Sequence, residues 1–363
     1  MLTDVRSVAA RRPSQTRAVV VTAVLLAVLA LGWLAAVPPA HAATRTMEKG
    51  VSFCGYWKDS YDGSGPRTAL RQLRATGATW AMVLVTVYQA NVESTTISRA
   101  EPNTPTDASL LGIIAYAHTI GLRVMLKPQL DFLNDPAHCR SQIGPDFSDA
   151  DWATWFASYD ETIVHYAKLA ADAKCEQLSV GCELDSTVSH EAAWRQVIAD
   201  VRSVYTGKLT YAADPIRVGP QVVTWWDAVD LIGEDTYPNL SGRLHPTVAQ
   251  LVAGWRAYYA ALFKVHVRWH KPVIFTEVGV RSLAGAASAP WDWQRSGAVD
   301  LVVQQRWYRA ALQTFAARSW MKGLFLWQWS TYPSAGGPHD GSYTPHGKPA
   351  AVVLRSWFTD RLR

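Results

Sequence analysis

The feature that most constrains this chain is a regular alternation of two hydrophobic patterns that begins at Gly50. Short apolar runs such as 80–87 and 123–128 predict buried strands, and longer stretches such as 152–166 and 299–318, with apolar residues at helical spacing, predict helices. Strands that alternate with helices predict a parallel sheet, because parallel neighbours need a crossover connection. Eight strand–helix units of this length predict an α/β fold with a single (β/α)8 (TIM) barrel.

The first 42 residues do not follow this pattern. They contain a basic start, an uncharged apolar run over 18–37, and the ending Pro38-Pro39-Ala40-His41-Ala42, which has a small-x-small cleavage pattern. This arrangement predicts a secretory signal peptide over 1–42, one mature domain over 43–363, and a secreted protein. The apolar run is also about as long as a membrane span, so an uncleaved N-terminal anchor is the alternative.

The charge of the chain depends mainly on this segment. Residues 1–42 hold four arginines and one aspartate, a net +3, so their removal lowers the net charge from +5 to +2. The mature chain has no basic stripe suited to phosphates, so nucleic acid is not an expected partner. We expect a monomer, with no membrane contact unless the N-terminal segment is retained.

The cysteines and histidines do not form a recognisable metal motif. The ten histidines contain no HExxH, and the four cysteines lack the spacing of a zinc site, so neither a metal nor another cofactor is expected. Four cysteines allow three disulfide pairings. If 177–182 is a strand, Cys175 and Cys182 lie at its opposite ends, roughly 20 Å apart. A bridge between Cys54 and Cys139 is favoured, because both follow strands at the same face.

Two glutamates lie where apolar runs end. Glu277 follows Val273-Ile-Phe275, and Glu183 follows Leu178-Ser-Val-Gly181. Carboxyl ends of parallel strands face a common ligand crevice, so both side chains are expected there. One carboxylic acid and one carboxylate flanking a bond are the requirement for glycoside cleavage. Either glutamate alone would be better explained as a surface residue at a loop start, and it is the pair that favours chemistry.

Strand alternation makes a further prediction about direction. Side chains two residues apart share a face of a strand. Four pairs near the strand ends are therefore expected to point inward together: Gly181 with Glu183, Asp235 with Tyr237, Phe275 with Glu277, and Trp327 with Trp329. Of the 17 tryptophans, 16 lie in the mature chain. Most are expected in the core, and the remainder are expected to stack on sugar rings.

Six segments in chain order carry a resemblance to a known family: Lys49-Gly-Val-Ser-Phe-Cys-Gly-Tyr-Trp57, Met125-Leu-Lys-Pro-Gln-Leu-Asp131, Val180-Gly-Cys-Glu-Leu184, Asp230-Leu-Ile-Gly-Glu-Asp-Thr-Tyr237, Phe275-Thr-Glu-Val-Gly279 and Gly347-Lys-Pro-Ala350. They resemble glycoside hydrolase family 113, whose known members are β-mannanases of a clan of retaining (β/α)8 glycosidases. The resemblance implies that Glu183 is the acid/base and Glu277 the nucleophile, and that the substrate is a β-linked mannan-type polysaccharide or oligosaccharide. Three residues depart from the pattern usual in the family or its wider clan. Cys182 stands in place of Asn, Gln129 in place of His, and Asp214 in place of Asn.

Seven further residues are predicted to bind substrate or to support the nucleophile. Tyr237 is the expected hydrogen-bond donor to Glu277, with Arg281 either beside it or in a structural ion pair. Trp329 is expected beneath the cleaved sugar, as in related barrels, or else within the barrel core. Sugar contacts are also assigned to Trp57, Lys127, Asp131 and Asp235. The alternatives are a salt bridge between Lys127 and Asp131, and a loop-capping role for Asp235.

Three other functions remain open from the sequence. A retaining glycosidase could act on another β-glycan such as β-glucan, because the loops that distinguish the sugars are not placed by sequence. A non-catalytic carbohydrate-binding barrel would keep the aromatic residues without needing both glutamates. A surface or cell-wall interaction protein would use the barrel only as a scaffold. The mode of attack, endo or exo, is also open.

Overall fold

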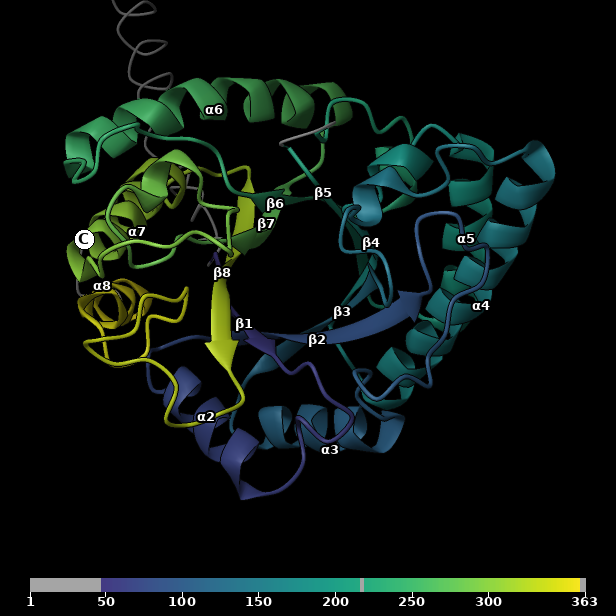
Figure 1. The fold of residues 1–363 in the computed structure, drawn as a ribbon, viewed down its shortest axis with the longest axis horizontal. Coiled ribbons are helices and arrows are strands. Elements are labelled where there is room, and N and C mark those ends of the chain that lie inside the picture. Colours follow the sequence, from purple (N-terminus) through teal and green to yellow (C-terminus); the bar gives the residue numbers. More distant parts are fainter. Residues whose placement is uncertain (1–46, 216–218, 360–363) are drawn as a thin grey trace, which may run out of the picture. The chain divides into compact units, whose positions relative to one another are not determined.

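The computed structural model describes residues 47–215 and 219–359, and the predicted signal peptide lies outside them. Eight parallel strands close in chain order into a barrel (Figure 1), which confirms the predicted fold. The strands are β1 (Glu48–Cys54), β2 (Trp80–Gln89), β3 (Arg123–Phe132), β4 (Gln177–Cys182), β5 (Lys208–Ala213), β6 (Leu231–Thr236), β7 (Val273–Val278) and β8 (Met321–Ser330). Because all strands run in one direction, their carboxyl ends form a single rim.

Helices surround this barrel (Figure 1). The described residues contain α2 (Ser64–Arg74), α3 (Asp107–Thr119), α4 (Asp149–Asp172), α5 (Glu191–Val204), α6 (Val248–Trp269), α7 (Leu301–Phe315) and α8 (Pro349–Phe358). Short 3-10 helices lie in the rim loops: η1 (Arg140–Gln142), η2 (Asp185–Thr187) and η4 (Ala286–Ser288). The two longest helices start at capping boxes, in which the side chain of Ser148 or Thr247 accepts a hydrogen bond from the backbone three residues later.

The connection from β5 to β6 differs from the other six connections between strands. A short helix is predicted over 225–229, and the structure has only the 3-10 helix η3 (Trp226–Ala228) there among the described residues. Trp225 and Trp226 are both fully buried, and their rings pack against Tyr211 of β5. These two large side chains therefore cover the outer face of β5 where other strands have a helix.

Two hydrophobic clusters hold the barrel together. The larger one lies between the strands and the helices and includes the buried rings of Trp155, Trp194, Trp225, Trp226, Trp255 and Trp307. The smaller one fills the barrel interior below the rim and consists of Cys54, Trp80, Met82, Leu84, Met125, Leu231, Ile274 and Phe325. Packing therefore accounts for many of the tryptophans, and the interior is a filled core rather than a channel.

Irregular register near the rim decides where the side chains of β7 point. Between Phe275 and Val278, β7 has one residue more than its partner β8. An inserted residue reverses the alternation of side chains beyond it. Phe275 packs outward against Trp255 and Phe315, whereas Glu277 lines the rim cavity. The prediction that Phe275 and Glu277 share a face is therefore wrong, although Glu277 does reach the crevice.

An extra residue also reverses the alternation of side chains in β4 and β8. An added Cβ at Gly181 would lie 2.9 Å from the outward rings of Trp194 and Tyr211, so Gly181 faces the helices, while Glu183 lines the cavity. In β8 one extra residue lies between the positions paired with Val51 and Phe53 of β1. Trp327 therefore turns toward the cavity, and Trp329 packs into the outer cluster. The predicted pairings of Gly181 with Glu183 and of Trp327 with Trp329 are wrong for this reason.

None of the helices among the described residues has the combined length and hydrophobicity that crossing a membrane would require.

The aromatic outer core makes a prediction about stability. Trp194 is fully buried, stacks on Trp225 at 4.9 Å between ring centres, and donates Nε1–H to the Thr187 carbonyl at 3.0 Å. Trp194→Ala should lower the free energy of unfolding by about 3–5 kcal/mol in urea titrations, because it leaves a large cavity. Trp293→Ala, at a side chain that is 71 % exposed, should change it by less than about 0.5 kcal/mol. Equal effects of the two changes would contradict this account of the core.

Candidate active site

A cavity of about 750 Å³ opens at the rim, and Glu183 and Glu277 both line it. Much of the remaining wall is aromatic: Tyr56, Tyr237, Trp291, Trp293, Trp327 and Tyr343. Polar side chains at the same wall include Gln129, Arg140, Asp214, Arg281 and Gln328. Two carboxyl groups among flat aromatic surfaces and a few hydrogen-bonding groups can hold a sugar ring and act on its linkage.

Both oxygens of Glu277 are held by donors. The Lys127 ammonium donates to Oε1 at 2.5 Å, and the Tyr237 hydroxyl donates to Oε2 at 2.7 Å, which is the hydrogen bond expected from the sequence. Two donors fix the carboxylate in one orientation and favour its ionised form. This is the arrangement that a carboxylate nucleophile needs.

Lys127 lies entirely beneath the cavity floor. Its side chain is fully buried, and Nζ also donates to Asp235 Oδ2 at 2.7 Å, while Thr276 Oγ1 donates to Asp235 Oδ1 at 2.7 Å. Burial disfavours the ammonium, but the carboxylates of Asp235 and Glu277 outweigh this and raise the pKa of Lys127 well above its ordinary value. Lys127 and Asp235 are therefore supports of Glu277, and neither lines the cavity as a sugar ligand.

Glu183 comes from the other side of the cavity and has an unusual backbone. It directly follows β4, and its φ of 54° lies in the left-handed region that non-glycine residues rarely adopt. Its backbone N–H donates to the Ala212 carbonyl at 2.8 Å, so this geometry is tied to β5. The side chain is turned into the cavity, where Oε2 accepts from Arg140 Nη1 at 2.5 Å. Strained backbone of this kind is typical of functional sites.

The charges in the site do not balance without a proton. Glu183, Asp235 and Glu277 bring three acidic groups, and Lys127 and Arg140 bring two cations. Burial raises the pKa of Glu183 against the pull of Arg140. Burial, together with the neighbouring Asp235 carboxylate, also raises the pKa of Glu277, against the pull of Lys127. One proton shared among the carboxyl groups near neutral pH makes the buried group electrically neutral.

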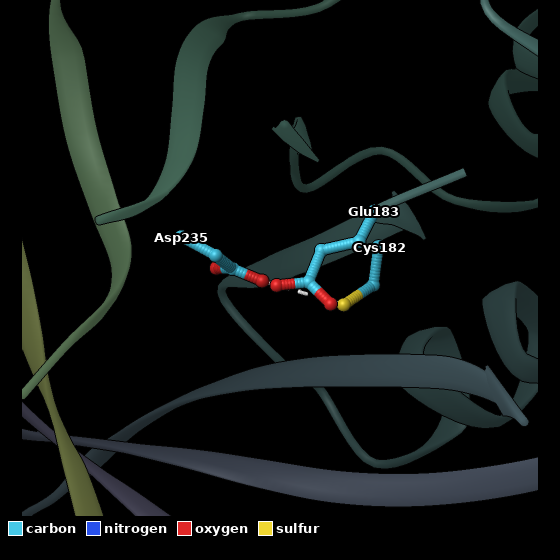
Figure 2. A group of neighbouring side chains, drawn as sticks. All are labelled: Cys182, Glu183 and Asp235. Atoms are coloured by element: carbon cyan, nitrogen blue, oxygen red, sulfur yellow. Dashed lines mark hydrogen bonds between the residues drawn. The ribbon is translucent and has the colours of Figure 1, made fainter. Parts of the chain in front are cut away.

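Cys182, Glu183 and Asp235 lie close together (Figure 2), with one ligand atom of each within 4.8 Å of the others. The site does not fit a metal ion, because cations already occupy its carboxylates: Lys127 is bonded to Asp235, and Arg140 to Glu183. Burial also raises the pKa of the Cys182 thiol well above its ordinary value, which disfavours the thiolate that binds metals. The thiol instead donates to Asp235 Oδ2 at 3.3 Å.

Two predicted polar contacts take other roles in the structure. Arg281 lines the cavity, but it does not donate to Glu277. Its guanidinium bonds the backbone carbonyls of Trp293 and Arg295, with the Trp293 contact at 2.8 Å, and so holds the loop after β7. The salt bridge between Lys127 and Asp131, the alternative to their sugar contacts, is not formed, since Asp131 pairs with Arg140 at 3.5 Å. Asp131 is half-exposed and lies outside the cavity wall.

The two predicted stacking residues also lie outside the main cavity. Trp329 is 2 % exposed and packs on His346 with ring centres 4.9 Å apart, so it cannot lie beneath a sugar. Trp327 takes that place in the wall because of the extra residue in β8. Trp57 is 52 % exposed and lines a smaller hollow of about 70 Å³, which shares Tyr56 and Gln328 with the main cavity.

Several wall residues carried no recognisable signal in the sequence. Arg140 lies in the long loop after β3, and Trp291 and Trp293 lie in the loop after β7. Loop residues have no periodic pattern that fixes their direction, so sequence patterns could not place these three side chains in the wall. Trp327 lies in a predicted strand, but regular alternation places it on the same face as Trp329, so the sequence alone does not distinguish the two.

The predicted disulfide is absent, since all four cysteines of the chain are free thiols. Cys54 points into the barrel interior and belongs to the inner hydrophobic cluster. Cys139 lies in the loop before η1, where its sulfur is 3.0 Å from Ser141 Oγ. Their positions on the same rim are as expected, but their side chains are directed into different surroundings.

Comparison with known proteins agrees with this geometry. The model of the family named Glycoside Hydrolase Family 113 matches residues 52–348. A solved GH113 β-1,4-mannanase is 30 % identical, with a TM-score of 0.77, over 87 % of this chain and 99 % of that one. The GH113 β-mannanase of Alicyclobacillus acidocaldarius is 32 % identical, with a TM-score of 0.76, over 86 % of this chain and 97 % of that one.

More distant structures share the barrel. The β-glucuronidase of Ruminococcus gnavus is 13 % identical with a TM-score of 0.60, over 86 % of this chain and 50 % of that one, a likeness of fold alone. No curated protein sequence matches this chain.

The buried ammonium of Lys127 makes the first prediction for this site. Lys127→Met leaves two buried carboxyl groups without their cation, and should lower the free energy of unfolding at pH 7 by about 3–5 kcal/mol in urea titrations. Lys168→Met, at an exposed position of α4, serves as the control and should change it by less than about 0.5 kcal/mol. A Lys127→Met protein as stable as the parent would show that the three side chains are not coupled.

Glu234, next to the site, makes a prediction about pH. It is 1 % exposed, its Oε1 accepts from Thr236 Oγ1 at 3.0 Å, and burial raises its pKa from 4.5 to about 8. Between these pH values the folded protein keeps a proton that the unfolded chain releases, so its contribution to stability is lost as the pH rises from 4.5 to 8.

Glu234→Gln should therefore flatten the decline of unfolding free energy between pH 5 and 8, as measured by urea titration at several pH values. The matched change Glu161→Gln, at a side chain 77 % exposed, should leave the decline as it is in the parent. A parent whose stability rises across this range would contradict the assignment of a buried, protonated Glu234.

Proposed function

The chain belongs to glycoside hydrolase family 113, and from this premise we propose that it cleaves β-linked mannan chains by double displacement, with Glu277 as nucleophile and Glu183 as acid/base. The observation that supports the proposal most strongly is the paired support of Glu277 by Lys127 and Tyr237 in the cavity that Glu183 also lines. Membership of the family makes the protein a glycoside hydrolase, so a non-catalytic barrel is no longer an alternative.

In the first step, a Glu277 oxygen attacks the anomeric carbon. The bond from this carbon to the glycosidic oxygen breaks, the electron pair goes to that oxygen, and Glu183 supplies its proton. The departing chain leaves as an alcohol, the sugar remains esterified to Glu277, and Glu183 is now a carboxylate. Arg140, bonded to Glu183 Oε2, lies beside the negative charge that appears there.

In the second step, Glu183 removes a proton from water while the water oxygen attacks the anomeric carbon. The bond to Glu277 breaks, and its electron pair returns to the Glu277 carboxylate, where Lys127 and Tyr237 are already placed to bond both oxygens. Glu183 is protonated again at the end of the cycle. Two displacements at one carbon return the product to the β configuration.

The hydrogen bonds support this division of labour. Protonating Glu277 would compete with Lys127 at one oxygen and Tyr237 at the other, and Lys127 has no lone pair with which to accept. Glu183 has a donor at Oε2 only, among the described residues, which leaves its other oxygen able to carry the proton. The single shared proton of the site is therefore best placed on Glu183.

The sugar preference rests on the relatives and on the wall. The two family members with 30 % and 32 % identity are both named β-mannanases. Trp327 offers a flat face in the cavity beside Glu277, and we assign it the platform role expected of Trp329. Trp291 and Trp293 extend the aromatic wall along the loop after β7.

The test is hydrolysis of glycan panels by the purified protein, comparing mannan, mannooligosaccharides and β-glucan. The parent should release reducing sugar from mannan, and Glu277→Ala and Glu183→Ala should each reduce the rate roughly a thousandfold or more. Trp293→Ala is the control for a substitution in the cavity wall. It should still release reducing sugar from mannan, because both glutamates remain. If the parent acts on β-glucan alone, the proposed substrate is wrong and β-glucan takes its place. Full activity of Glu277→Ala would overturn the proposed mechanism.

We also propose that residues 1–42 direct secretion and are removed. The apolar run 18–37 and the ending Ala40-His41-Ala42 support this. Expression of the full chain in a secreting host, followed by mass spectrometry, should find a protein that begins at Ala43 in the medium. A full-length protein retained with the membrane fraction would support the anchored alternative.

A further inference from the structure

Arg140 is held at three points beside Glu183. Each of its guanidinium nitrogens has a different oxygen partner: Nε donates to the Leu130 carbonyl at 2.7 Å, Nη1 to Glu183 Oε2 at 2.5 Å, and Nη2 lies 3.5 Å from Asp131 Oδ2. The side chain is 16 % exposed. The bond to Leu130, at the end of β3, fixes the planar group so that it faces both carboxylates at once.

This arrangement creates a conflict for a general acid. A cation at 2.5 Å favours the ionised form of Glu183, whereas an acid must hold a proton until the leaving oxygen needs it. Other charged and titratable groups around Glu183 come from every neighbouring strand end: Lys127 of β3, Cys182 of β4, Asp214 after β5, Asp235 of β6 and Glu277 of β7. Burial and the acidic members of this set oppose Arg140 and raise the pKa of Glu183.

We propose that Arg140 is a positioning residue for Glu183, which orients its carboxyl group and stabilises the charge it gains on protonating the leaving oxygen, while Asp131 competes for the same guanidinium. This inference rests on the proposed function. It makes Glu183 a stronger acid than burial alone would allow, which assists the departure of a poor leaving group such as a sugar alcohol. Asp131, which lies outside the cavity, weakens this effect because its carboxylate offsets part of the positive charge that Arg140 presents to Glu183.

Opposite shifts in pH dependence test the proposal. The rate constant kcat/KM falls at high pH as Glu183 loses its proton in the free enzyme. Arg140→Gln removes a neighbouring cation and should move this alkaline limb upward by roughly one pH unit. Asp131→Asn leaves the guanidinium with Glu183 alone and should move the limb downward by roughly a few tenths of a unit. Arg140→Lys, which keeps a charge without the fork, should lie between the parent and Arg140→Gln.

A second measurement separates acid strength from general damage. At the optimum pH, Arg140→Gln should lower kcat/KM for a β-1,4-linked mannooligosaccharide roughly threefold to tenfold, because its leaving group needs the proton. It should leave kcat/KM for a dinitrophenyl β-mannoside close to the parent value, because that leaving group departs without protonation. Arg195→Gln, which breaks a matched arginine–carboxylate pair with Asp227 outside the cavity wall, is the control and should leave kcat/KM for both substrates unchanged.

The outcomes distinguish this inference from the function on which it rests. Limbs that move in opposite directions for Arg140→Gln and Asp131→Asn, with thermal unfolding close to the parent, support the proposal. Limbs that coincide with the parent, or equal losses on both substrates, overturn it while leaving Glu183 as acid/base. If Glu183→Gln keeps full activity on mannooligosaccharide, the proposed function fails first, and the role of Arg140 fails with it.

Discussion

One ammonium group organises the base of this cavity. Lys127 is fully buried and bonds Asp235 and Glu277 at the same time, at 2.7 and 2.5 Å. A buried charge is tolerated only with partners, so the Lys127 ammonium needs these carboxylates, and they in turn need it. Three strands, β3, β6 and β7, must end at one rim for the three groups to meet, and the closed barrel of parallel strands supplies that arrangement. The orientation of Glu277 follows from this contact, and the ammonium favours the ionised form in which Glu277 would act.

Small irregularities in the strands determine which side chains reach the cavity. A regular barrel alternates side chains between the interior and the helices, and the rim would then receive only every second residue. Extra residues in β4, β7 and β8 reverse this alternation just below the rim. They turn Glu277 and Trp327 toward the cavity and leave Phe275, Gly181 and Trp329 against the helices. The left-handed backbone of Glu183 is a further local departure with the same result.

The barrel and the two glutamates could be predicted from sequence because both depend on repeated, local patterns. Strand ends mark themselves by a change from apolar to polar residues, and Glu183 and Glu277 stand at two such changes. The direction of the side chains near the rim could not be predicted, because a one-residue bulge has no distinct composition. For this reason Trp329 rather than Trp327 was wrongly predicted to lie beneath the sugar. Arg140, Trp291 and Trp293 belong to loops whose course is set by tertiary contacts. The Cys54–Cys139 bridge failed for a related reason: residues on one rim need not point at one another.

In the proposed cycle Glu277 forms a covalent bond to the sugar while Lys127 and Tyr237 hold its carboxyl group. Fluorine at C2 of a mannoside slows both steps, and a good leaving group speeds the first step again, so the intermediate should accumulate. Mass spectrometry of the intact protein, followed by peptide mapping, measures this directly. We expect one added sugar per chain, on the peptide that contains Glu277. A label on any other residue would contradict it, as would a protein that turns over mannan with inversion and takes up no label.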